Sequence, residues 1–157
     1  MNVPIDPSAT PPKLVKMLGV AQLVALPIVY LMIAYFVRIP AKAGGELLMM
    51  LYILLIIAAV YPAFVPLIIR FQIANYRKTA DSAVTPDNIY TSCGIIAFAI
   101  VDAIYTFGLV IYFLSGNINW MYYFYPIGVV WSLVYWPTDA KYRKFLTKVQ
   151  GNEPIVT

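Results

Sequence analysis

Four long apolar stretches, separated by short polar segments, constrain the fold of this chain more than any other feature. They cover approximately residues 17–37, 47–69, 92–114 and 118–136. A helix of roughly 20 apolar residues crosses a bilayer core about 30 Å thick, and each stretch has about that length. None shows the strict apolar–polar alternation of a membrane barrel strand. The sequence therefore predicts an all-α integral membrane protein with four transmembrane helices.

The composition excludes most other classes of protein. Hydrophobic residues make up 62% of the 157 positions and charged residues 11%, whereas roughly a quarter of an average soluble domain is charged. The chain has no histidine and one cysteine. This removes His-based metal sites, the usual haem ligands, and the triads and dyads that activate Ser or Cys nucleophiles. We therefore expect no enzyme, no catalytic residue, no metal and no cofactor.

The positive charges indicate how the chain is oriented. If the four stretches cross the membrane in turn, Arg38 and Lys42 fall on one side and nine Lys and Arg residues on the other. These nine are Lys13, Lys16, Arg70, Arg77, Lys78, Lys141, Arg143, Lys144 and Lys148. Because basic residues are enriched in cytoplasmic loops, we expect both termini in the cytoplasm. The charge is then a topology signal, and no nucleic-acid partner is expected.

Short connections predict two helical hairpins. Residues 38–46 and 115–117 contain Gly, Pro, Ser and Asn, which favour turns. Short links of this kind place consecutive helices antiparallel. We expect a single domain over residues 1–157, folded as a four-helix bundle with cytoplasmic tails at residues 1–16 and 137–157. The first apolar stretch is too long for the core of a signal peptide, so it is expected to remain as an anchor.

The two hairpins share identical residues at an offset of 75 positions. The matching pairs are Asp6 and Asp81, Thr10 and Thr85, Pro11 and Pro86, Gly19 and Gly94, Tyr30 and Tyr105, and Pro62 and Pro137. Thr is a good N-cap and Pro suits the first helical position, so the two Thr-Pro pairs predict equivalent helix starts. These matches favour an internal duplication around a pseudo-two-fold axis along the membrane normal.

One acidic residue, Asp102, lies near the middle of the third apolar stretch. It follows the start of that stretch by about ten residues, or roughly 15 Å of helix. An ionised Asp at this depth costs about 2.5–3.5 kcal/mol on insertion scales, so we expect Asp102 to be protonated or hydrogen bonded. Tyr105 and Thr106 follow at i+3 and i+4 and share its helix face. Gln22, in the first stretch, is a further buried polar candidate.

Two prolines in the second stretch indicate a partner for Asp102. Pro62 and Pro66 lack an N–H, so the carbonyls of Ala58 and Pro62 lose their usual helical donors. Ala58 lies at about the depth of Asp102, so we expect Asp102 to face the first two helices and to donate to the Ala58 carbonyl. Such a contact is most simply an interhelical clasp worth about 0.6–2 kcal/mol. A proton- or ion-binding carboxylate and a contact with a partner subunit are the alternatives.

Other candidates lie near the helix ends. Lys141, Arg143, Lys144 and Lys148 can contact anionic lipid headgroups, or they act only as topology anchors. Aromatic residues are expected to form belts at the two interfaces, with a quinone or pigment pocket around Trp131 as the alternative. The belt residues are Trp120, Tyr122, Tyr123, Tyr125, Tyr135, Trp136 and Tyr142. Cys93 is expected to be a small core residue, with palmitoylation as the alternative.

The segment of residues 99–110, AIVDAIYTFGLV, resembles the proton-binding helix of the proteolipid c subunits of rotary ATPases. Those proteins have a carboxylate, then Ala, and then Gly-Leu-Val or Gly-Leu-Ile about six residues on. Here these are Asp102, Ala103 and Gly108-Leu109-Val110. The resemblance implies a double-hairpin subunit that carries protons or ions on this carboxylate. It is confined to one helix, because proteolipid ring helices are packed with Gly and Ala and this chain has eight glycines in total.

Most of the second half also resembles a loosely defined group of small bacterial four-span membrane proteins of unknown function. The shared features are an acidic residue followed by Gly-Leu-Val, a turn, an aromatic–Pro pair and a basic tail. In this chain they are Asp102, Gly108-Leu109-Val110, Ser115-Gly116-Asn117, Trp136-Pro137 and Lys141-Tyr142-Arg143-Lys144. This resemblance implies the fold and a location in a bacterial inner membrane, but no activity.

These features favour a non-enzymatic accessory or structural subunit of a membrane assembly. Its expected partners are the lipid bilayer and either other membrane subunits or further copies of the chain. The alternative is a proton- or ion-translocating subunit that uses Asp102. An enzyme acting on lipid or quinone is least favoured, because no pattern supplies a nucleophile with its base.

Overall fold

The structure is a computed structural model that describes residues 8–40, 44–79 and 85–149, and every regular element in these ranges is helical. The elements are α1 (Lys13–Val20), a π-helical turn (Ala21–Ala25), α2 (Leu26–Phe36), α3 (Gly45–Val60), a 3-10 turn (Tyr61–Phe64), α4 (Val65–Thr79), α5 (Pro86–Ser115), α6 (Ile118–Tyr122), α7 (Phe124–Val134) and α8 (Asp139–Val149). The predicted all-α class is confirmed for these ranges. The predicted tail residues 1–7 and 150–157, Lys42, and the matched pair Asp6 and Asp81 lie outside the described residues.

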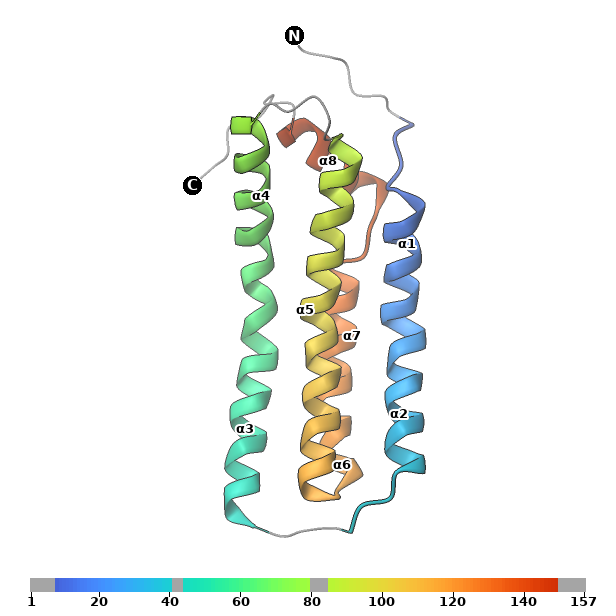
Figure 1. The fold of residues 1–157 in the computed structure, drawn as a ribbon, viewed down its shortest axis with the longest axis vertical. Helices are drawn as coiled ribbons and strands as arrows, with labels where there is room; N and C mark the ends of the chain where they lie inside the picture. Colours follow the sequence, from blue (N-terminus) through green and yellow to red (C-terminus); the bar gives the residue numbers. More distant parts are fainter. Residues whose placement is uncertain (1–7, 41–43, 80–84, 150–157) are drawn as a thin grey trace.

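Within the described residues, three helical rods are long and apolar enough to cross a membrane. They are Lys13–Phe36, Gly45–Tyr76 and Pro86–Ser115, and each contains nearly all of one of the first three predicted stretches. The first rod joins α1 to α2 and the second joins α3 to α4, while α5 forms the third alone. Figure 1 shows α5 between the other two rods, with α7 beside it.

Prolines account for the interruptions of the first two rods. The π-helical turn ends just before α2, and the N–H of Leu26 donates to the Ala21 carbonyl five residues earlier. The next residue, Pro27, has no N–H to donate, so a helical bond is missing at this point. In the second rod, Pro62 lies within the tightened 3-10 segment and Pro66 follows it in the first turn of α4, and neither has an N–H to donate. Both rods continue beyond their prolines, so each remains long and apolar enough to cross a membrane.

The fourth predicted stretch is two helices, α6 and α7, rather than one continuous helix. Pro126 cannot donate to the carbonyl of Tyr122 four residues earlier, and the ladder breaks between them at Tyr123. The pair runs beside α5 and contacts it along its length (Figure 1). It ends at Val134, before the predicted limit at residue 136. At 1.5 Å per residue the pair is about 25 Å long, which is shorter than the three other rods.

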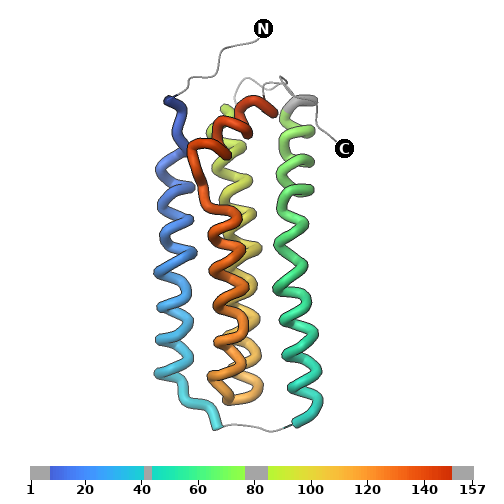
Figure 2. The backbone as a smooth tube through the Cα atoms, turned by 180° about the vertical axis from the view of Figure 1, so that it is seen from behind, coloured from blue at the N-terminus to red at the C-terminus, as the bar shows by residue number. Residues whose placement is uncertain are grey.

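The predicted cytoplasmic tail 137–157 contains a helix, α8, that the sequence analysis missed. α8 packs across the end of the bundle against α4 and α5 (Figure 2). Its buried residues Tyr142, Phe145 and Val149 recur at i, i+3 and i+7, which is the spacing of one helix face. That pattern was available in the sequence, but the low apolar content of the segment hid it.

The helix starts support only one of the two predicted Thr-Pro caps. The Thr85 hydroxyl oxygen accepts a hydrogen bond from the Asn88 N–H at 3.3 Å, and Pro86 occupies the first turn of α5. By contrast, α1 begins at Lys13 with Pro12 as N-cap and no side-chain cap bond. The two starts are therefore not equivalent, and the internal duplication stays a prediction.

The core is built around α5, which contacts every other helix of the described chain. Its main cluster contains Leu51, Ala58, Val101, Ile104, Tyr105, Ile111 and Phe124. The exterior is also apolar: Phe36 is 75% exposed, Met49 67% and Ile56 64%. Soluble monomers rarely expose continuous apolar surface of this kind, whereas lipid covers it without cost.

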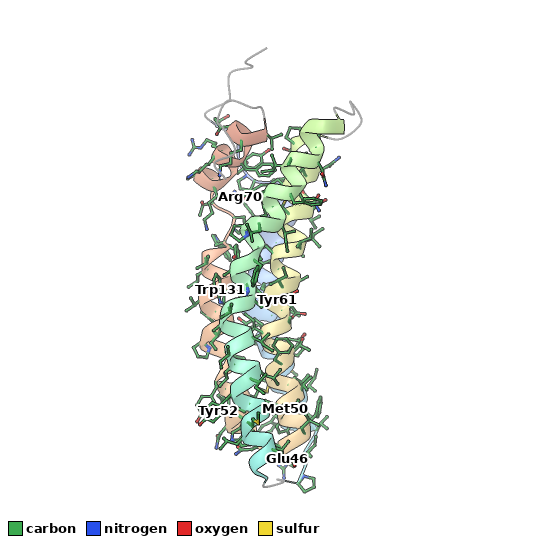
Figure 3. The ribbon with its side chains drawn as sticks, turned by 90° about the vertical axis from the view of Figure 1, so that its left-hand side faces the viewer. Glu46, Met50, Tyr52, Tyr61, Arg70 and Trp131 are labelled. Atoms are coloured by element: carbon green, nitrogen blue, oxygen red, sulfur yellow. The ribbon has the colours of Figure 1, made fainter. Side chains whose placement is uncertain are left out.

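Two opposite ends of the bundle carry charged residues. One end of the bundle contains the starts of α1 and α5, the end of α4 and all of α8 (Figure 1). The other end contains the end of α2, the start of α3 and α6. Figure 3 shows Glu46 near one end of the α3–α4 rod and Arg70 toward the other, with Tyr61 and Trp131 at middle height.

Candidate functional site

Asp102 lies in the middle of α5, partly buried, where α5 faces α2. The hydroxyl oxygen of Tyr30, on α2, is 3.1 Å from its Oδ1 and 3.3 Å from its Oδ2. The same hydroxyl oxygen is 3.2 Å from Oγ1 of Thr106, one helical turn further along α5. The structure thus joins the candidates Asp102 and Thr106 through Tyr30, which the sequence analysis did not connect with them. We call these three side chains the Asp102 cluster.

The Asp102 cluster can accommodate a carboxyl group in either protonation state. When Asp102 is ionised, the Tyr30 hydroxyl donates to it. When Asp102 is protonated, its O–H can donate to Tyr30, and Tyr30 can then donate to Thr106. Both arrangements use the same three side chains at the same distances. The cluster can therefore hold or release a proton at the middle of α5 without a movement of the helices.

Three other tyrosines donate their hydroxyl groups to backbone carbonyls of the first two rods. The bonds run from Tyr112 to Val37 (2.5 Å), from Tyr125 to Pro27 (2.9 Å) and from Tyr135 to Pro62 (2.5 Å). The Val37 carbonyl needs such a partner because it lies at the end of α2, where helical donors run out. Tyr125 and Tyr135 were expected in interface belts; the structure shows them partly buried and bonded between helices instead.

Asp102 does not bond to either of the two proline-freed carbonyls. The Pro62 carbonyl accepts from the Val65 N–H, through the 3-10 turn, and from the Tyr135 hydroxyl. Ala58 is completely buried in the main core. Among the described residues, however, Asp102 bonds to Tyr30 of the first rod and not to the Ala58 carbonyl of the second. The predicted Asp102–Ala58 bond is therefore replaced, because a tyrosine on α2 reaches the carboxyl group.

Two buried polar atoms have no hydrogen-bond partner among the described residues: Nε2 of Gln22 and the hydroxyl of Tyr105. Gln22 is 3% exposed and lies in the π-helical turn. Tyr105 is 0% exposed, and its ring packs against Gly128 of α7. A Cβ at Gly128 would lie 2.5 Å from Cζ of Tyr105, so the ring occupies the space that the glycine leaves free. Tyr105 therefore serves packing between α5 and α7.

A second polar group ties α8 to the bundle. Tyr142 donates its hydroxyl to the Asp87 carboxylate at the start of α5, and its ring lies 4.9 Å from the ring of Tyr90. Lys16 and Asp139 form an ion pair at 3.3 Å between α1 and α8. Burial raises the pKa of Tyr142, and the hydrogen bond to Asp87 raises it further.

The predicted headgroup-contact residues divide into two kinds. The Lys141 ammonium donates to the carbonyls of Val134 at 2.7 Å and Trp136 at 3.1 Å, so it caps the end of α7. Burial lowers the pKa of Lys141. Arg143 and Lys144 are exposed on the outer side of α8, whereas Lys148 is partly buried.

Cys93 is 4% exposed and packs with Ile73, Ile89, Phe145 and Val149, as expected for a core residue. A thiol buried in this way is not presented for palmitoylation. Trp131 stacks on Tyr135 with ring centroids 5.7 Å apart. In the part of the chain that the structure describes, no group of three or more Cys, Asp or Glu side chains is placed to hold a metal ion.

Comparison of the chain with known protein families, curated proteins and solved structures finds no match. The two family resemblances therefore stay predictions, and the geometry above is the basis for the proposals that follow.

Proposed function

We propose that the chain is an integral membrane protein with four spans and both termini in the cytoplasm, in a bacterial inner membrane. Three rods long and apolar enough to cross a bilayer support this, together with the α6–α7 pair that runs alongside them (Figure 1). Lys13, Lys16 and α8 belong to one end of the bundle, and Arg38 belongs to the other. Reporter fusions at the C-terminus and after residue 40 test the orientation. They should report opposite sides of the membrane, and the same side would contradict the topology.

We further propose that the protein is a non-enzymatic accessory or structural subunit of a membrane assembly. The observation that supports this is the position of Asp102, a partly exposed carboxyl group halfway along an apolar helix. The Tyr30 hydroxyl binds one side of it, and lipid is a poor environment for the remainder. A polar group on the helix of a partner subunit, or of a second copy, would complete its hydrogen bonding. The hydroxyl groups of Tyr112, Tyr125 and Tyr135 fit a structural role, since they join helices.

A photo-cross-linking residue at Ala99 tests this proposal in native membranes. Ala99 is exposed one turn before Asp102 on α5, and Ile56, 64% exposed on α3, is the matched control position. We expect a protein adduct of defined mass from position 99 and none from position 56. Asp102→Leu should remove the adduct, and Asp102→Asn should keep it because the amide still forms hydrogen bonds. Lipid adducts alone at both positions, with a monomer in mild detergent, would overturn the proposal.

A second candidate function is proton or ion translocation through Asp102. The observation that favours it is the continuous set of exchangeable hydroxyl protons from Asp102 through Tyr30 to Thr106. Purified protein in vesicles with an internal pH dye should then show proton flux that Asp102→Asn abolishes and Tyr30→Phe slows. Asp87→Asn is the control, because Asp87 lies at the start of α5 and bonds to Tyr142. Flux equal to that of protein-free vesicles, or flux unchanged in Asp102→Asn, would exclude this function.

A further inference from the structure

A cavity of about 190 Å³ lies beside α8, away from the Asp102 cluster. Its walls come from α1, α4, α5, the end of α7 and α8. Most of the wall is apolar and includes Ile69, Ala97, Val134 and Phe145. Two cationic side chains, Lys141 and Lys148, line it from α8. The cavity therefore pairs an apolar interior with positive charge on one side.

The position of the Lys141 ammonium group is fixed by the fold. It donates two hydrogen bonds, one to the carbonyl of Val134 at the end of α7 and one to the carbonyl of Trp136 just beyond it. An ammonium group has three donors, so one N–H of Lys141 is left for a ligand. Burial disfavours its charged form, and a nearby anion would offset that effect. A ligand that matches this cavity therefore has an anionic group attached to an apolar chain.

We propose that the cavity binds one anionic phospholipid of the cytoplasmic leaflet, with its phosphate at Lys141 and Lys148 and the first part of one acyl chain inside. The volume exceeds the roughly 150 Å³ that holds a benzene-sized molecule but is below the roughly 300–1,000 Å³ of pockets for whole ligands. It suits a chain segment whose remainder stays in the bilayer. The cavity lies at the α8 end of the bundle, which also carries Lys13 and Lys16 at the start of α1 and the basic residues of α8. This positive charge would attract anionic lipids.

Titration of phosphatidylglycerol into the delipidated full chain, read by native mass spectrometry, tests this site. We expect one tightly bound lipid per chain and weaker binding of phosphatidylcholine. Lys148→Ala and Lys141→Ala should each weaken binding about fivefold, the equivalent of about 1 kcal/mol per basic residue. Lys144→Ala is the charge control, because Lys144 lies on the same helix but does not line the cavity. It should change binding less than twofold.

A second pair of variants tests the acyl-chain part of the site without a change of charge. Val134 lines the cavity and is 46% exposed, so Val134→Trp can fill the space from its outer side. Val130, one turn earlier on α7 and 57% exposed, provides the control Val130→Trp. Only Val134→Trp should weaken binding of phosphatidylglycerol. Helix content measured for each variant separates loss of the site from loss of the fold, and Lys148→Ala leaves the α7 cap intact.

Three results would overturn the inference. Equal binding of phosphatidylcholine would show that the lysines do not select the headgroup. Equal weakening by Lys144→Ala and Lys148→Ala would show general charge attraction. Equal effects of Val134→Trp and Val130→Trp would show that no chain enters the cavity. None of these results depends on the cross-link at Ala99 or on proton flux, so the lipid site and the proposed function can fail independently.

Discussion

The contact between Tyr105 and Gly128 offers a sharp test of how α5 and α7 are held together. In Gly128→Ala, the new Cβ would lie 2.5 Å from Cζ and 2.6 Å from Cε1 of a ring that is 0% exposed. Overpacking of a filled core costs about 1–3 kcal/mol, and the ring of Tyr125, 5.5 Å away, blocks one direction of escape. The higher helix propensity of alanine returns about 0.8–1 kcal/mol. Because the contacts are far below van der Waals distance, the upper part of that cost, about 2–3 kcal/mol, applies. We therefore expect Gly128→Ala to lower the free energy of unfolding by about 1–2 kcal/mol.

Unfolding by SDS in detergent micelles, followed by tryptophan fluorescence, measures this change. Gly45→Ala is the control, since nothing lies within 4 Å of a Cβ at Gly45. Tyr105→Leu removes the clashing ring atoms, so in that background Gly128→Ala should become stabilising. The cycle then gives a coupling of about 2 kcal/mol between the two positions. Equal effects of Gly128→Ala in both backgrounds, or no effect in the parent protein, would refute the packing argument.

Three further predictions use the same unfolding assay. Gln22→Met should leave stability unchanged or raise it by about 1 kcal/mol, because it removes a buried amide nitrogen that has no partner among the described residues. A clear loss of stability would show that Gln22 has a binding partner. Tyr135→Phe should lower the free energy of unfolding by about 0.6–2 kcal/mol. The loss should be smaller in a Pro66→Ala background, because a backbone N–H then returns near the Pro62 carbonyl. Equal losses in both backgrounds would contradict the explanation by proline. Burial and then the Asp87 bond raise the pKa of Tyr142 from its ordinary value of 10.0. The neutral form of Tyr142 therefore contributes its full share of the free energy of unfolding below pH 10, and this share is lost as the pH rises through the higher pKa of the folded state. Tyr142→Phe should make the free energy of unfolding less dependent on pH in the alkaline range.

The sequence predicted the helices well where apolar length alone decides the structure. The first three stretches each correspond to one rod, although the second and third rods, of 32 and 30 residues, extend beyond the predicted limits. Thr85 caps α5 as its Thr-Pro signal indicates. The fourth stretch was harder to predict, because Pro126 breaks a segment that is apolar throughout. α8 was missed because its apolar residues form one face of an otherwise polar segment.

The partner of Asp102 could not be found from sequence, although its depth and the need for a partner could. Depth along a helix follows from residue number, but the rotation of one helix against another depends on how side chains pack. Two kinds of partner lie at about the depth of Asp102: the proline-freed carbonyls on the second rod and Tyr30 on the first. Tyr30 is the partner because α2 packs against α5 with Tyr30 facing Asp102. The hydroxyl bonds of Tyr112 and Tyr125 depend on packing in the same way.

Different interactions hold the two sides of α5, and this separation matters for function. Toward α7, the contact is a matter of shape, with the ring of Tyr105 seated on Gly128. Toward α2, the contact is polar, and its three side chains keep their hydrogen bonds whether or not Asp102 carries a proton. A partner helix at Asp102 can therefore act on the contact between α2 and α5 while α5 and α7 stay packed. Asp102→Asn, whose amide still forms hydrogen bonds, should then alter flux without the loss of stability expected from Gly128→Ala.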